Sequence, residues 1–554
     1  MANKRNIVII GGVAGGASAA ARLRRLDEDA EIILFERGEH VSFANCGLPY
    51  HISGEIEDRE DLLVQTAAGL KRRFRMDVRT RHEVLAIHRD RKVVEVKDLK
   101  DGRVFEQAYD AIVLSPGAAP IRPPLPGIDL PGVHSLRNLA DMDAIKRAVD
   151  AKPAGRALLV GGGFIGLELA EALRQRGWEV LLVEKGTQVL AQADPEVAAL
   201  VARELRANGV ELRLRADLRG LSQRPDGRLD ADLGGTREGV DLVVLAIGVR
   251  PETGLARAAG LALGERGGIQ VDEHLRTSDP AIYAVGDAIE VRDVVTDRLG
   301  LVPLAGPANR QGRIAADNLA GIPSEYRGTQ GTAIVRVFKL AFAMTGSSEK
   351  ALKAAGRAYE KVYLHPNQHA GYFPGASALQ IKLLFDPRHG RILGAQVAGE
   401  EGVDKRIDVL ATAIQAEMTV HDLEELELAY APPFGSAKDA INFAGFVAGN
   451  VVDGRIGIFH MEEAAAQGSG QVLVDVRTAR EFSEGAIPGA INIPVDSLRE
   501  RLAELPKDKE ILVYCRVGLR GYLAGRILSQ AGYKVRNLSG GWLTWEAWKE
   551  AQAA

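Results

Sequence analysis

The sequence predicts an α/β protein with several domains, on three observations. At 554 residues the chain is too long for one hydrophobic core, because domains usually have about 100–200 residues. One pattern occurs twice, at 7–36 and at 157–184: a buried strand, a glycine turn, an alanine-rich helix and a second strand that ends in an acid. A fresh α/β pattern then begins at Val472, after a polar stretch. We therefore expect at least three separate sheets.

Composition excludes several classes of function. The 70 Lys and Arg residues nearly balance the 74 Asp and Glu residues, so no broad basic field is available for nucleic acid or anionic lipid. No apolar run approaches the roughly 18 residues of a membrane span. Cys46 and Cys515 are the only cysteines, which excludes a disulfide framework and indicates a reducing, cytoplasmic location. We predict no metal site.

The second copy of the repeated pattern contains the complete G-x-G-x-x-G motif. Glycines in this motif allow a tight turn and close approach of the backbone to a pyrophosphate at a helix N-terminus. Glu184, about twenty residues later, can accept a hydrogen bond from a ribose 2′-hydroxyl, which favours NADH; Lys185 beside it leaves NADPH open. The residues expected to bind the nicotinamide nucleotide are Gly161, Gly163, Phe164, Ile165, Gly166, Glu184 and Gly248.

The first copy departs from the motif because Val13 stands at the middle glycine position. Glu36 nevertheless supplies the ribose acceptor, and Gly286-Asp287 follows another buried strand, where we expect a helix-start acid facing flavin ribityl or pyrophosphate groups. Two nucleotide sites imply electron flow from a nicotinamide through FAD. The residues expected to bind FAD are Gly11, Val13, Ala14, Gly15, Gly16, Glu36, Arg37, Ser115, Pro116, Gly117, Gly286 and Asp287.

The order of these motifs predicts two nested Rossmann-like domains, because the strand before Gly286 would return to the first sheet. A proline-rich stretch from Pro120 to Pro131 suits a crossover between the two domains. The expected domains are an FAD-binding domain at 1–118 and 250–325, a NAD(P)H-binding domain at 119–249, an α+β interface domain at 326–450, a linker at 451–469 and a C-terminal α/β domain at 470–554.

Cys46 is the expected acceptor of the electrons. It follows a polar turn where a helix should start, and a helix N-terminus favours the thiolate needed to attack sulfur. No second cysteine lies nearby, so its sulfur partner must come from a substrate thiol, or the single sulfur must be oxidised. The alternative is a buried structural cysteine.

Residues 1 to about 450 resemble the coenzyme A disulfide reductases, a single-cysteine branch of the pyridine nucleotide disulfide oxidoreductases. The resemblance rests on three segments: Ser42–Tyr50, Gly399–Asp408, and Tyr430–Phe434 with Lys438-Asp439. It implies a mixed disulfide between Cys46 and coenzyme A. It also implies a homodimer in which Tyr372 and Tyr430 of one subunit approach the sulfur of the other, where their phenols could protonate a leaving thiolate.

Coenzyme A carries phosphates, so its site needs local cations. Arg22, Arg25, Lys71 and Arg310 are the candidates, although basic runs are often only solvated helix faces. Ser42 and Asn45 are added as substrate contacts through the motif around Cys46.

The chain from Val472 resembles a rhodanese domain. The matching segments are Val472–Arg477, Glu481–Pro494 and Val513–Cys515. After the strand ending at Tyr514, backbone N–H groups of the loop from Cys515 to Arg520 can converge on the sulfur, and Arg520 adds positive charge. Ala486 stands where the family often has histidine. The alternative is an inactive rhodanese fold.

Together these features predict a flavoprotein that reduces sulfur–sulfur bonds. Cys515 would take a sulfane sulfur and pass it to coenzyme A or another thiol, and Cys46 would then attack the persulfide. The substrate could be a disulfide, a persulfide or a polysulfide. Two rivals are open: an NADH oxidase or peroxidase that uses a Cys46 sulfenic acid, and a sulfurtransferase whose flavin module only senses redox state.

Overall fold

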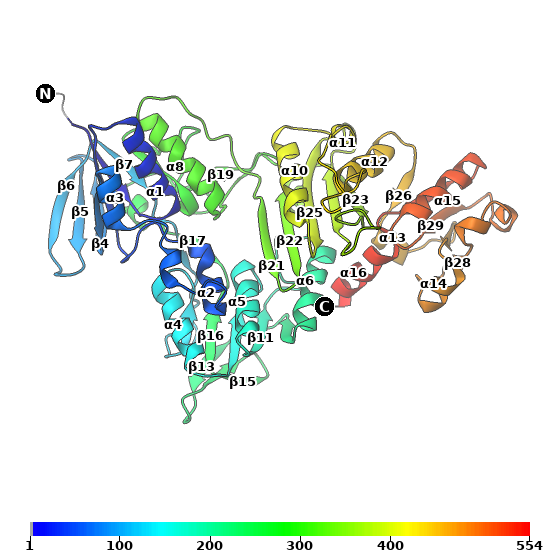
Figure 1. Cartoon of the computed structure of the whole chain (residues 1–554), viewed down its shortest axis with the longest axis horizontal. Helices are drawn as coiled ribbons and strands as arrows, with labels where there is room; N and C mark the ends of the chain where they lie inside the picture. The colour runs from blue at the N-terminus through cyan, green and yellow to red at the C-terminus, as the bar shows by residue number, and fades with distance from the viewer. Residues whose placement is uncertain (1–3, 554) are drawn as a thin grey trace. The chain divides into compact units, whose positions relative to one another are not determined.

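The structure, a computed structural model, describes residues 4–553, which fall into two compact units. The first unit runs through Val183 and resumes from Ala216 to Gly331. The second joins Glu184–Arg215 to the chain from Thr332 onward. Figure 1 labels many of the helices and strands of both units. In the described part of the chain, no helix combines the length and the apolar character needed to cross a membrane.

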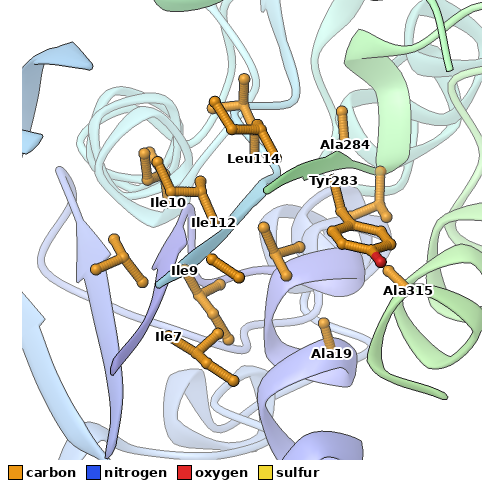
Figure 2. Packing of buried hydrophobic residues seen from close by; sticks show 14 of the residues in the cluster. Ile7, Ile9, Ile10, Ala19, Ile112, Leu114, Tyr283, Ala284 and Ala315 are labelled. Carbon is orange, nitrogen blue, oxygen red and sulfur yellow. The ribbon is translucent and has the colours of Figure 1, made fainter. Parts of the chain in front are cut away.

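A parallel sheet with the strand order β18-β7-β1-β2-β3 organises the first unit. Its side chains pack against α1 and α8: Figure 2 shows Ile7 and Ile9 of the sheet near Ala19 of α1, and Tyr283 near Ala315 of α8. The elements are β1 Asn6–Ile10, α1 Ala14–Leu26, β2 Glu31–Glu36, β3 Asp77–Thr80, β7 Ala111–Leu114, β18 Ile282–Ala284 and α8 Ala305–Leu319. Because β18 pairs with β7, the chain does return to the first sheet after the second, as predicted.

The part of the second parallel sheet that belongs to the first unit has the order β11-β10-β16-β9. Short antiparallel strands β8 and β17 pair where the chain leaves the first sheet and where it comes back. The elements are β8 Ala118–Pro120, β9 Val133–Ser135, α4 Leu139–Asp150, β10 Arg156–Val160, α5 Phe164–Gln175, β11 Glu179–Glu184, β16 Leu242–Leu245 and β17 Val249–Pro251. Two nested nucleotide-binding folds are therefore confirmed.

Two antiparallel three-stranded sheets and several short elements complete the first unit. The sheets are formed by β4 His82–His88, β5 Val93–Asp98 and β6 Val104–Ala108, and by β13 Gly220–Gln223, β14 Leu229–Asp232 and β15 Arg237–Val240. The short elements are α2 Leu48–Ser53, α3 Ala67–Phe74, α7 Gly254–Ala258, β19 Val291–Arg292 and β20 Leu299–Gly300.

The second unit contains an antiparallel sheet with the order β21-β22-β25-β24-β23. Every residue of β24 and β25 is buried. The elements are α6 Pro195–Ala207, β12 Val210–Leu214, β21 Ala333–Val337, β22 Leu340–Gly346, α9 Glu349–Ala355, β23 Glu360–Leu364, β24 Gln380–Phe385, β25 Ile392–Gly399, α10 Val403–Gln415, α11 Val420–Glu424 and α12 Ala440–Val452. The predicted α+β domain is thus an antiparallel sheet with helices.

A parallel sheet with the order β26-β30-β29-β27-β28 forms the C-terminal domain. Its elements are β26 Gly457–Phe459, α13 Met461–Ala465, β27 Gln471–Asp475, α14 Ala479–Glu484, β28 Ile491–Asn492, β29 Glu510–Tyr514, α15 Leu519–Gln530, β30 Val535–Leu538 and α16 Gly541–Ala553. The interpretation of 451–469 as a linker was wrong: this segment contains β26, which pairs with β30 as the edge strand of the domain. A strand of three residues is too short to give a periodic pattern in the sequence.

A buried ion-pair cluster ties α6 to the antiparallel sheet. Lys382 of β24 is fully buried, and its Nζ lies 2.8 Å from Asp194 and 2.5 Å from Glu196, and also contacts Glu349. These three carboxylates are close enough together to suggest a cation site, but the lysine ammonium already lies among them. The cluster is therefore best described as an ion-pair network that fixes the start of α6.

Candidate active site

The second glycine turn has the shape that a dinucleotide needs. A Cβ atom on Gly166 would lie 2.1 Å from the carbonyl oxygen of Gly161, so only glycine permits this close turn. A Cβ atom on Gly163 would meet nothing within 4 Å. Gly163 is also the N-cap of α5, so its open side lies where a pyrophosphate would meet the helix N-terminus.

The first turn repeats this geometry despite its valine. A Cβ atom on Gly16 would lie 1.9 Å from the carbonyl oxygen of Gly11. Val13 is the N-cap of α1, with φ −108° and ψ 175°, close to the φ −83° and ψ −176° of Gly163. Both are extended conformations that any residue adopts. The departure from the motif at Val13 therefore leaves the turn intact.

Backbone N–H groups hold the carboxylate of each acid that was predicted to face a ribose. Glu36 accepts hydrogen bonds from the N–H groups of Gly12 at 2.8 Å and Gly38 at 2.7 Å. Glu184 accepts one from the N–H of Gly186 at 2.6 Å. The two strand ends thus present their acids in the same way.

One prediction about the flavin site needs correction. Asp287 lies in a three-residue 3₁₀ turn, Gly286–Ala288, and not at the start of an α-helix; the next such helix after it is α8, from Ala305. The N–H of Gly286 donates instead to the side chain of Gln311 at 2.8 Å. Burial raises the pKa of Asp287, against the opposing charge of Arg137.

Cys46 lies in a 3₁₀ turn, Asn45–Gly47, immediately before α2, and it is exposed. The segment that leads into this turn is joined to the first glycine turn, because the N–H of Ser42 donates to the carbonyl oxygen of Gly12 at 2.8 Å. Ser42 has φ 50°, a left-handed conformation that is uncommon for a residue other than glycine. The predicted helix start next to Cys46 is thus found, close to the FAD turn.

The prediction that this position favours the thiolate of Cys46 was wrong, because the surrounding groups of this chain favour the protonated thiol. Loss of surrounding water raises the pKa of the Cys46 thiol, and the negative charges of Glu168 and Asp287 raise it further. Helix α2 has only six residues, so the partial positive charge at its N-terminus lowers the pKa of Cys46 only weakly. The groups of this chain that surround Cys46 therefore favour the protonated thiol.

Tyr372 and Tyr430 form a pair on the second unit. Their hydroxyl oxygens are 2.9 Å apart, although 58 positions separate them in the sequence. Both side chains are exposed, at 75% and 47%. The hydrogen bond with Tyr430 raises the pKa of Tyr372. The pair presents phenol groups on a surface of the α+β domain.

Cys515 directly follows β29 and begins a loop that leads into α15. The N–H of Gly518 donates to the Cys515 sulfur at 3.2 Å, and Gly518 is the N-cap of α15. The side chain is fully buried. Arg520, in the first turn of the helix, donates two hydrogen bonds to Glu481, at 2.8 and 2.6 Å, and also contacts the Cys515 sulfur. This loop can hold a negatively charged sulfur.

Comparisons with known proteins match the chain from end to end. Residues 5–312 match the family of pyridine nucleotide-disulphide oxidoreductases, residues 332–440 match the dimerisation domain of that family, and residues 461–548 match the rhodanese-like domain. The chain belongs to the pyridine nucleotide-disulphide oxidoreductases.

Three relatives illustrate the resemblance. A coenzyme A disulfide reductase from Staphylococcus haemolyticus is 36% identical over 80% of this chain and 99% of its own length. The structure of reduced CoADR-RHD from Bacillus anthracis is 48% identical, with a TM-score of 0.95 over 98% of each chain. A NAD-dependent persulfide reductase from A. fulgidus is 38% identical, with a TM-score of 0.90 over 98% of this chain and 100% of its own.

In this oxidoreductase, the cations predicted to bind phosphates are not equivalent. Arg22 is engaged in an ion pair with Asp317 at 2.7 Å. Arg25, Lys71 and Arg310 are exposed on α1, α3 and α8, and Arg310 lies over the ring of Tyr326. The exposed three are the better candidates for binding a ligand.

Sequence reasoning missed Arg137 and Glu481. Arg137 donates to Glu252 at 2.6 Å and its charge acts on Asp287, which places it at the predicted flavin site. Arg37 also pairs with Glu252, at 3.1 Å. Glu481 belongs to a capping box with Thr478, a signal that marks a helix start but does not predict the contact with Arg520.

Proposed function

We propose that this chain is an FAD-dependent reductase that uses NAD(P)H to cleave coenzyme A disulfides, persulfides or polysulfides at Cys46. The observation that carries the proposal is a solitary exposed thiol four residues after Ser42, whose N–H is hydrogen-bonded to the first glycine turn. The names of the relatives with matching chains support the same class of substrate.

The residues around both glycine turns fit the two nucleotides. The first turn, Glu36 and the segment from Ser115 to Gly117 would hold FAD, and the second turn with Glu184 would hold the nicotinamide nucleotide, with NADH favoured by the carboxylate. When bound, these groups supply a pair of electrons to the sulfur centre.

Cys46 acts first as a nucleophile. Its thiolate attacks one sulfur of R–S–S–R′, the original sulfur–sulfur bond breaks, and R′–S⁻ leaves with a proton. Two electrons and one proton from NAD(P)H then reduce the Cys46–S–S–R bond and release the second thiol. The phenol pair of Tyr372 and Tyr430 is a suitable proton donor, contributed by the partner subunit of a homodimer. The dimerisation domain supports this assembly.

Cys515 would prepare the substrate. Its thiolate accepts a sulfane sulfur from a donor to give Cys515–S–S⁻, and the outer sulfur then passes to coenzyme A or another thiol. The resulting persulfide is a substrate for Cys46, which releases sulfide. The contact between the Gly518 N–H and the sulfur supports an anionic intermediate at this position.

The test compares Cys46→Ser and Cys515→Ser in the holoenzyme. We expect Cys46→Ser to abolish NADH oxidation with coenzyme A persulfide and with coenzyme A disulfide. Cys515→Ser should retain both activities and lose only sulfur transfer from a separate donor. Normal NADH oxidation by Cys46→Ser with these substrates would reject the proposal. Sulfenic acid on Cys46 during rapid turnover with oxygen or peroxide would favour the oxidase alternative instead.

A further inference from the structure

The arginines around Cys515 differ in how their charge is balanced. Arg477 is buried and pairs with the fully buried Asp475 at 2.6 Å. Arg520 pairs with Glu481 through two hydrogen bonds. Arg516, in the loop itself, is exposed to solvent. Arg477 and Arg520 are therefore each neutralised by a carboxylate of their own, which accepts more than one hydrogen bond from the guanidinium group.

Glu481 is held in place independently of Arg520. Its carboxylate accepts hydrogen bonds from the N–H of Thr478 at 3.0 Å and from the hydroxyl of Thr478 at 2.9 Å. The hydrogen bonds from Arg520, together with those from Thr478, lower the pKa of Glu481 to about 2. Glu481 is therefore ionised throughout the physiological pH range, and its negative charge stays beside Arg520.

This balance matters for the choice of sulfur donor. Thiosulfate is a dianion at neutral pH, and it releases sulfite, another anion, when its sulfane sulfur is transferred. An alkyl persulfide carries no sulfonate group at its reactive end. An uncompensated Arg520 would attract the dianion towards the sulfur, whereas an Arg520 that is already paired with Glu481 adds little to that attraction.

We propose that Glu481 is a specificity residue that directs Cys515 towards persulfide donors and against thiosulfate. This inference rests on the proposed sulfurtransferase role of Cys515. In the favoured reaction, the Cys515 thiolate attacks the outer sulfur of R–S–SH, a new sulfur–sulfur bond forms, the old one breaks, and R–S⁻ leaves. The transferred sulfur stays in the sulfane state, so the step needs no oxidant or reductant.

The experiment measures single-turnover loading of Cys515 in full-length holoenzyme that carries Cys46→Ser, so that only Cys515 accepts sulfur. Intact-protein mass spectrometry follows the gain of one sulfur atom from thiosulfate or from the persulfide of 2-mercaptoethanol. We expect Glu481→Gln to accelerate loading from thiosulfate by about fivefold, because the amide can still accept from Arg520 but no longer cancels its charge. Loading from the persulfide should change by less than about twofold.

Three further variants complete the experiment. Glu484→Gln is the matched control, because Glu484 lies on the same helix and pairs with the exposed Arg480 at 3.0 Å. It should leave the ratio of the two rates unchanged, as should Glu481→Asp, which keeps the charge. Arg520→Met leaves Glu481 unbalanced and should slow thiosulfate more than the persulfide, which also tests the inference if Glu481→Gln does not fold.

Two results would overturn the inference in different ways. If Glu481→Gln slows both donors equally, Glu481 only orients Arg520 and does not select the donor. The Cys46→Ser protein without further substitutions could take up sulfur from neither donor while the enzyme with Cys46 restored still reduces coenzyme A disulfide. In that case the sulfurtransferase role of Cys515 itself is wrong.

Discussion

Replacement of Lys382 by methionine would test the ion-pair cluster of the second unit. The lysine side chain is 0% exposed and contacts Asp194, Glu196 and Glu349. Burial outweighs the attraction of Lys382 for Asp194, whose pKa is raised. For Glu196 and Glu349, the attraction of Lys382 together with other charges and hydrogen bonds outweighs burial, and their pKa values are lowered. After the substitution, Lys361 would still pair with Glu349 at 3.0 Å, but Asp194 and Glu196 would lose their ammonium.

The stability that Lys382→Met should lose follows from these contacts. Removal of one partner of a buried ion pair costs about 3–5 kcal/mol, because a charge is left without compensation. Hydrogen exchange of the amides in β24 and α6 should therefore accelerate by about a hundredfold or more under conditions in which the opening equilibrium controls exchange. The assay reports this region alone, so it does not require two-state unfolding of a multidomain chain.

The sign of the pH dependence provides a second check. Without the ammonium, burial and mutual repulsion raise the folded-state pKa values of the carboxylates above their unfolded values. Such groups stabilise the fold below the unfolded pKa, and this stability is lost as the pH rises through the folded pKa. The stability that is lost in Lys382→Met should therefore be larger at pH 8 than near pH 5.

Lys353→Met is the matched control. Lys353 lies 3.6 Å from the same Glu349, but its side chain is 69% exposed, so its loss should cost no more than about 0.5 kcal/mol. If Lys382→Met exchanges no faster than Lys353→Met, the cluster does not stabilise the unit as argued.

Three other predictions concern His365 of the second unit, the thiol of Cys46 and the second glycine turn. Burial lowers the pKa of His365 to about 4, so between pH 4 and about 6.5 the folded second unit holds fewer protons than the unfolded chain. The unit therefore loses stability as the pH falls through that window. The melting temperature of His365→Gln should depend less on pH than that of the parent protein, and an equal dependence would contradict the argument. Glu168→Gln should lower the pKa of Cys46 and accelerate its alkylation by iodoacetamide at pH 8 by about twofold or more, measured with Cys515→Ser in the background, whereas an unchanged rate would exclude the charge effect. Gly166→Ala should disrupt the second turn and abolish NADH binding, whereas Gly163→Ala should keep the melting temperature and raise the KM for NADH; equal effects of both on folding would show that Gly163 does not face the nucleotide.

Local patterns in the sequence were sufficient to predict the two glycine turns, the acids after their strands and both solitary cysteines. Each of these signals lies within about thirty residues, the span of one strand–helix–strand unit, so it can be recognised from the local sequence alone. The family resemblance added the Tyr372 and Tyr430 prediction, which spacing alone does not reveal. The strand β26 was missed because three residues are too few to give a periodic pattern.

Only the tertiary structure decided which charged groups meet. Arg520 and Glu481 are 39 positions apart, and Lys382 and Glu196 are 186 positions apart. The sequence by itself determined where the reactive sulfurs stand in the chain. Their electrostatic surroundings, including the carboxylates that raise the pKa of Cys46, depend on chain segments that only folding brings together, because Coulomb interactions act through space and not along the sequence.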